Sequence, residues 1–119
     1  MNVMVVPVTG EFVSNNAIAA RRVQDLSASQ AARDAGGWLL AEMPSSLQEV
    51  RVHQGPLSGL AIEFGDAAWN LTVEISPDGL MLFFGEEIAG TREIDPFPFD
   101  ARSDALVNRI SKVYAANDR

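Results

Sequence analysis

Cysteine is absent from this sequence of 119 residues, and histidine and tyrosine each occur once. Without cysteine the chain cannot form a disulfide framework, a thiolate zinc site, an iron–sulfur cluster or a thiolate nucleophile. Basic side chains are also few, since nine Lys and Arg stand against sixteen Asp and Glu for a formal net charge of −7. This deficit disfavours direct binding to nucleic acid or anionic lipid, because both need Lys and Arg to neutralise phosphates.

Long apolar runs are missing as well. No run approaches the roughly 18 residues that a membrane-spanning helix needs. Residues 1–8 are apolar, but no basic segment precedes them and Pro7 interrupts them, so they do not match a secretory signal peptide. We therefore expect a cytoplasmic protein that has no contact with a membrane.

The overall composition is that of an ordinary globular protein. Apolar residues make up 47% of the chain and charged residues 21%. A chain of this length can bury one hydrophobic core and is too short for two independent ones. We expect a single domain over residues 1–119.

The N-terminal part changes from a strand-like to a helical pattern. Residues 2–9 are rich in valine and predict a short strand or an extended arm. Beyond them, apolar residues recur at intervals of three and four, Ser27 or Ser29 can cap a helix, and Pro44 ends the pattern. A short first helix would end at about Leu26 before this cap, and as the working model we take one kinked helical region over about 16–43.

Two adjacent glycines, Gly36 and Gly37, interrupt this helical pattern. Each costs about 1 kcal/mol of helix propensity. Close approach to a neighbouring backbone would explain their presence, and so would a break that turns Trp38 into the core. The sequence leaves both explanations open.

From residue 50 to residue 94 the period changes to two, which is the spacing of strands. The run 69–75 is the clearest, because its odd positions are all apolar and its even positions all polar. Ser76-Pro77-Asp78-Gly79 is a strong turn signal, so 80–84 should return antiparallel to 69–75. A meander over 57–84 follows, and a further short strand at 91–95 would extend it.

A helix should close the chain. Asp100 or Ser103 can cap it, and its apolar stripe lies on one side, formed by Leu106, Val107, Ile110, Val113 and Tyr114. Residues 95–100 contain two prolines and should form an extended connection. The expected fold is α+β: an N-terminal helical region, an antiparallel meander of three to five strands, and a C-terminal helix packed on one face of the sheet.

Motifs for catalysis are missing. His53 has no acidic residue close enough in sequence to be its hydrogen-bond partner, so a partner would have to come from elsewhere in the fold. No serine lies in a Gly-x-Ser-x-Gly motif, and no glycine loop matches a phosphate-binding motif. The acid pairs around residues 86–95 lack the spacing of a calcium loop. We predict a protein that is not an enzyme, with no catalytic residue, cofactor or metal.

The segment 80–84, Leu-Met-Leu-Phe-Phe, is apolar on both faces. If its even positions pack with the apolar face of 69–75, then Met81 and Phe83 project on the opposite face. There another segment covers them, or they form an exposed anchor of the kind found at interfaces. The sequence does not decide between these two states.

Acidic residues gather directly after this segment. Between residues 86 and 104 six acids meet only two arginines, a local charge of −4. An apolar anchor beside acids suits a partner protein with a basic surface, because the acids speed encounter and the anchor slows release. The predicted partner-binding residues are Met81, Phe83, Glu86, Glu87, Glu93 and Asp95.

These features favour a small acidic protein-binding module without catalytic activity. It would be of the antitoxin, immunity or inhibitor type, of the kind that phages and mobile elements encode, and would engage a basic site on a partner protein. One alternative is a secretion-chaperone-like homodimer that holds an extended client on its sheet. The other is an enzyme or small-ligand-binding protein that uses His53 and therefore needs a concave pocket around it.

Overall fold

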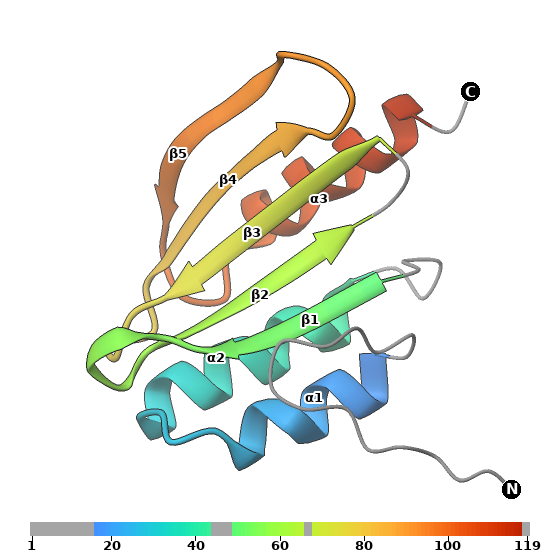
Figure 1. Cartoon of the computed structure of the whole chain (residues 1–119). Helices are drawn as coiled ribbons and strands as arrows, with labels where there is room; N and C mark the ends of the chain where they lie inside the picture. Colours follow the sequence, from blue (N-terminus) through green and yellow to red (C-terminus); the bar gives the residue numbers. More distant parts are fainter. Residues whose placement is uncertain (1–15, 44–48, 66–67, 118–119) are drawn as a thin grey trace, which may run out of the picture.

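The computed structural model describes residues 16–43, 49–65 and 68–117 of the chain (Figure 1). Within this part the α-helices and strands follow the order α1 (Asn16–Asp25), α2 (Gln30–Glu42), β1 (Glu49–Gln54), β2 (Leu60–Gly65), β3 (Trp69–Ile75), β4 (Met81–Glu87), β5 (Glu93–Phe99) and α3 (Asp104–Asn117). The predicted α+β architecture is confirmed, with five strands. The predicted strand or arm over 2–9 and the helix stop at Pro44 lie outside the described residues.

The predicted N-terminal helical region is confirmed, but it consists of two separate helices and not of one kinked helix. Helix α1 ends at Asp25, and α2 begins anew after Ser29. The Ser29 hydroxyl oxygen accepts a hydrogen bond from the backbone N–H of Ala32 at 3.0 Å, which satisfies a donor that a helix start leaves unpaired. A good N-cap therefore starts a second helix where the apolar pattern alone suggests continuity.

The glycine pair lies inside α2 without breaking it. A Cβ atom at Gly36 would lie 3.2 Å from Val23 Cγ1 in α1. The missing side chain thus lets the Val23 side chain pack closely against α2, whereas the first explanation supposed a neighbouring backbone. Trp38 is only partly buried.

The five strands form one antiparallel sheet in the order β1-β2-β3-β4-β5. Residues that lie directly opposite each other in such a sheet point to the same face. In the β2–β3 pair, Ile62 lies opposite Val73 and Phe64 lies opposite Leu71. All four side chains are buried, which confirms the predicted apolar face of 69–75.

All three helices lie on one side of the sheet (Figure 1). Helices α1 and α2 pack against the β1 to β3 half. Helix α3 begins directly after Ser103, one of the two predicted caps, and buries Leu106 and Ile110. The Arg109 guanidinium of α3 lies 5.9 Å from the centroid of the Phe83 ring. The core therefore fills the space between the helices and one face of the sheet.

We call the other side of the sheet the outer face. No described helix or strand packs on it. Strand alternation places twelve residues with described side chains there: Arg51, His53, Ala61, Glu63, Asn70, Thr72, Glu74, Leu82, Phe84, Glu86, Glu93 and Pro98.

The pairing of β3 with β4 differs from the prediction by one residue. The Gly79 N–H donates to the Ser76 carbonyl at 2.8 Å, and Gly79 has a φ of +88°. The Ser76 N–H in turn donates to the Leu80 carbonyl at 2.9 Å. Three residues therefore form the loop, and Met81 lies opposite Ile75.

This shift exchanges the two faces of β4, because side chains of a strand alternate. Met81 and Phe83 are 1% and 0% exposed in the core. The prediction that they project away from the core was therefore wrong. Leu82 and Phe84 are on the outer face, where both are partly exposed.

Strand β5 is continuous from Glu93 to Phe99, whereas the sequence predicted a short strand at 91–95 followed by an extended connection at 95–100. Pro96 and Pro98 fit because β5 is an edge strand, whose outer N–H groups have no partner strand to donate to. A register shift opposite Phe84 accommodates the extra residue of β5.

Candidate binding site on the outer face

The structure separates the residues that were predicted to form one partner-binding surface. Met81 and Phe83 lie under the helices and cannot be exposed anchors. Glu87 lies opposite Trp69, on the side of the sheet that faces the helices. The predicted surface therefore does not exist as a single patch.

Glu87 instead holds the β4–β5 hairpin together. Its carboxylate accepts hydrogen bonds from Arg92 Nε at 3.1 Å and Arg92 Nη2 at 2.5 Å, and its N–H donates to the Arg92 carbonyl at 2.9 Å. Arg92 also lies 5.4 Å from the centroid of the Trp69 ring, a cation–π distance. The hydrogen bond from Arg92 lowers the pKa of Glu87. Glu87 thus already has a basic partner within the chain.

Glu86 and Glu93 remain together on the outer face. They lie directly opposite each other across β4 and β5, and both are exposed. Like charges in this position repel, and no salt bridge to either residue is present among the described residues. Asp95 is exposed at the register shift two residues further on. A cation from a partner would relieve the repulsion between Glu86 and Glu93.

A metal ion is not an obvious source of that cation. In the described ranges, no group of three or more His, Asp or Glu side chains has the arrangement of a metal site.

One row of residues crosses the outer face from β2 to β5. Ala61 lies opposite Glu74, Glu74 opposite Leu82, and Leu82 opposite Pro98. The row is apolar except for Glu74, which is exposed. Both cross-strand neighbours of Glu74 are therefore apolar, and neither can neutralise its charge.

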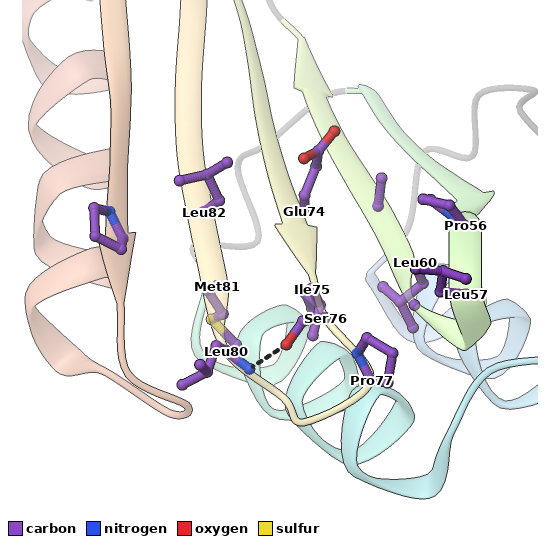
Figure 2. Close-up of a pocket in the computed structure, with 14 residues that line it drawn as sticks. Pro56, Leu57, Leu60, Glu74, Ile75, Ser76, Pro77, Leu80, Met81 and Leu82 are labelled. Atoms are coloured by element: carbon purple, nitrogen blue, oxygen red, sulfur yellow. Dashed lines mark hydrogen bonds between the residues drawn. The ribbon is translucent and has the colours of Figure 1, made fainter.

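This row lines a pocket of about 380 Å³ (Figure 2). The remaining walls come from the β1–β2 loop, with Pro56 and Leu57, and from the β3–β4 turn, with Leu80. Leu57 is 88% exposed and Leu80 is 52% exposed. The volume lies within the range of roughly 300–1,000 Å³ that is usual for ligand pockets, and an apolar lining with a few polar groups is also typical of them.

The β1–β2 loop is a tight turn in an unfavourable conformation. The Gly59 N–H donates to the Pro56 carbonyl at 2.9 Å, and the two residues between them, Leu57 and Ser58, have φ values of 54° and 68°. Turns with two positive φ values ordinarily contain Asn or Gly there. A leucine in this region costs about 1–2 kcal/mol, so the loop presents its leucine at a cost in stability.

Both walls of the pocket are attached to the start of α2. The Ser29 N–H donates to the Ser58 carbonyl at 2.9 Å, and the Ser29 hydroxyl donates to the Pro77 carbonyl at 2.6 Å. The Gln54 side chain adds bonds to both backbone groups of Ser27, each 2.9 Å long. These contacts fix the two walls relative to each other, so the pocket is formed before any partner arrives.

His53 has a carboxylate partner that the sequence did not predict. Its Nε2 lies 2.6 Å from Oε1 of Glu63, and Nη1 of Arg51 lies 3.7 Å from the same oxygen. His53 is the next residue of the cross-strand row, opposite Ala61, but it does not line the pocket. The pocket that the His53 hypothesis requires is therefore displaced from the imidazole by one strand.

Sequence reasoning missed Leu57, Glu74 and Leu82 as site residues. A signal for Leu57 exists, because a leucine in Gly-Pro-Leu-Ser-Gly interrupts residue types that otherwise favour a turn. Glu74 and Leu82 become neighbours only once the length of the β3–β4 loop is known.

Comparison of the chain with protein-family models, with curated proteins and with solved structures found no match. Among the described residues, no helix has the length and apolar character needed to cross a membrane. The function is therefore inferred from the geometry and chemistry of the outer face.

Proposed function

We propose that this chain is a small acidic protein-binding module without catalytic activity, which engages a basic segment of a partner protein through its outer face. An antitoxin, immunity or inhibitor protein acting in the cytoplasm is the type of module that fits. The observation that carries the proposal is the division of the sheet into two faces. The helices occupy one face, and the other presents a preformed apolar pocket next to three acids, Glu74, Glu86 and Glu93, that form no salt bridge with any described residue.

Electrostatics supports a basic partner. The chain has a net charge of −7. On the outer face Arg51 lies beside Glu63, whereas Glu74, Glu86 and Glu93 have no salt bridge among the described residues. Complementary charge of this kind raises association rates and selects partners. The same charge opposes direct binding to nucleic acid.

The apolar anchor of the module consists of residues other than those predicted. Leu57 and Leu80 are exposed at the pocket, Leu82 is a partly exposed residue of its lining, and Phe84 is partly exposed on the same face. Buried apolar contacts at the centre of an interface ordinarily carry most of the binding energy. We expect these side chains to slow dissociation, while the acids act on association.

Affinity purification from the organism that encodes the chain, followed by mass spectrometry and binding kinetics with the recovered protein, tests the proposal. The double variant Glu86→Lys/Glu93→Lys should lower the association rate at low salt by about tenfold or more and reduce its salt dependence. The control Asp25→Lys/Glu42→Lys changes the net charge by the same amount at exposed helix positions, and should have a much smaller effect. Equal effects of the two variants would contradict a role for the outer face.

The chaperone-like alternative would use the same face but requires a homodimer. An outer face that crosses five strands could hold an extended client segment. Light scattering with the purified chain separates the two hypotheses, because a strict monomer is incompatible with the chaperone-like dimer.

A further inference from the structure

The pocket combines an apolar lining with one carboxylate. Glu74 is the only charged residue among those that line it, and Ala61 and Leu82 lie on its two sides. A purely apolar ligand would leave this carboxylate facing apolar groups without a partner, which is unfavourable. A phosphate or carboxylate ligand would be repelled. A ligand that carries an apolar group next to a cation satisfies both features of the pocket.

The rims of the pocket favour an apolar side chain as the entering group. Leu57 and Leu80 come from two different loops, and both are more than half exposed. Hydrogen bonds to Ser29 hold both loops in place. A volume of about 380 Å³ has room for a leucine, methionine or phenylalanine side chain. Contact with these rims would remove the two exposed leucines from water.

A second acidic site lies further along the same face. Leu82 and Glu86 are four residues apart on β4, which corresponds to about 13 Å along a strand. Glu93 joins Glu86 there from β5. Phe84 lies on the outer face between the two sites. An extended chain that runs along β4 would also need four residues to pass from Glu74 to the Glu86–Glu93 pair.

From this spacing we propose that the outer face recognises an extended segment of the partner protein in which an apolar residue lies two positions from one Lys or Arg and a second Lys or Arg follows four residues beyond the first, because alternate side chains of an extended chain point to the same side. The apolar side chain enters the pocket, and the first cation pairs with Glu74. The second cation lies between Glu86 and Glu93. This inference rests on the proposed function and specifies what the partner must present.

Short peptides test the recognition without knowledge of the partner. The probes are Leu-Gly-Lys-Gly-Gly-Gly-Lys and its reverse, Lys-Gly-Gly-Gly-Lys-Gly-Leu, acetylated and amidated at their ends, because either chain direction fits the spacing. Amide chemical shifts of the isotope-labelled full chain report binding and its location. We expect at least one probe to bind with a Kd on the order of 1 mM, with the largest shifts at Ala61, Glu74 and Leu82.

Matched variants locate the binding. Ala61→Leu fills the pocket from a partly exposed outer-face position, and should weaken the better probe at least tenfold. Ala105→Leu adds the same group at an exposed position on α3 and should leave binding unchanged. Glu74→Gln should weaken the lysine probe severalfold but leave unchanged a probe with both lysines replaced by glutamine. An unchanged dispersed amide spectrum of each variant shows that it folds.

Several results would overturn the inference. No shift at the pocket with either probe up to several millimolar would do so, and so would equal binding of probes with lysine replaced by glutamate. Binding of phenethylamine as tight as that of the peptides would identify a small-ligand pocket instead. Shifts of the same residues on dilution of the chain alone would identify a second copy as the occupant.

The two proposals can fail separately. If the charge-reversal variant loses its partner while no probe binds, the protein-binding function stands and this recognition rule is wrong. If a probe binds as expected but the acids of the outer face have no effect on any recovered partner, the pocket stands and the proposed function is wrong.

Discussion

Leu57 combines two features that a surface loop ordinarily avoids. Its φ is 54° and its side chain is 88% exposed. Its neighbour Ser58 also has a positive φ. A glycine or asparagine at position 57 would fit the turn better and would expose no apolar group. Strain that persists at one exposed position commonly marks a residue kept for contact with a ligand.

Replacement of Leu57 should therefore separate stability from binding. Leu57→Gly removes the strain of the positive φ, whereas Leu57→Ala keeps it. We expect the free energy of unfolding of the glycine variant to be about 0.5–1 kcal/mol higher than that of the alanine variant. Both variants should bind the better of the two leucine–lysine peptides more weakly than the original chain does. Urea denaturation measures the difference in stability. A glycine variant less stable than the alanine variant would show that the loop is not strained in solution.

Glu87 and Arg92 give the β4–β5 hairpin a dependence on pH. The hydrogen bond from Arg92 lowers the pKa of Glu87 in the folded chain. A lowered pKa contributes stability above the pKa of the unfolded chain, and this contribution is lost as the pH falls through the lower, folded value. The loss thus begins in the ordinary glutamate range, at about pH 4 to 5, and continues below it.

Glu87→Gln should remove this part of the acid sensitivity. We expect the hairpin amides of the variant to lose less protection from hydrogen exchange between pH 5 and pH 3 than those of the original chain. Glu42→Gln serves as the control, because Glu42 is an exposed acid on α2 and lies outside the hairpin. The same loss of protection in all three chains would contradict a stabilising bridge to Arg92.

At the scale of elements, the register of β4 decides which surface the protein presents. Phe83 is 0% exposed beneath α3, and Phe84 is partly exposed on the outer face. Phe83→Ala should cost about 3–5 kcal/mol of unfolding free energy, as is usual for a buried phenylalanine. Phe84→Ala should cost clearly less. Chemical denaturation of the two variants compares them, and a larger loss for Phe84→Ala would support the register that the sequence suggested.

Most of the elements could be predicted from local pattern. The period of two over residues 69–75 gave the correct buried face, and the apolar stripe that includes Leu106 and Ile110 gave α3. The Tyr114 side chain of that predicted stripe lies outside the description. These predictions succeed because a strand or a helix with one apolar side buries that side almost irrespective of its surroundings.

The predictions that failed depend on single residues. The faces of β4 depend on the length of the loop at Ser76-Pro77-Asp78-Gly79. A change from a two-residue to a three-residue loop exchanges them. The side-chain cap at Ser29 separates α1 from α2. Neither choice changes the hydrophobic pattern, so the pattern cannot reveal it. Because β4 is apolar on both faces, its sequence fits the predicted register and the observed register equally well.

At the scale of the whole molecule, no helix in the described part of the chain covers the outer face of the sheet. Three helices cover one face, and the acids of β3, β4 and β5 lie on the other with an apolar pocket (Figures 1 and 2). The sequence indicated an acidic, apolar contact surface around residues 81–95, and Glu86, Glu93 and Asp95 are indeed exposed. The pocket could not be predicted, because it needs residues from four strands and two loops.

Site-specific photo-crosslinking in the organism that encodes the chain tests most directly whether the outer face is the contact surface. A photoreactive phenylalanine analogue replaces Leu82 on the outer face in one variant and exposed Ala105 on α3 in another. We predict that the probe at 82 captures one discrete basic protein, that Glu86→Lys/Glu93→Lys abolishes the capture, and that the probe at 105 captures nothing comparable. Capture at 105 but not at 82 would contradict the account.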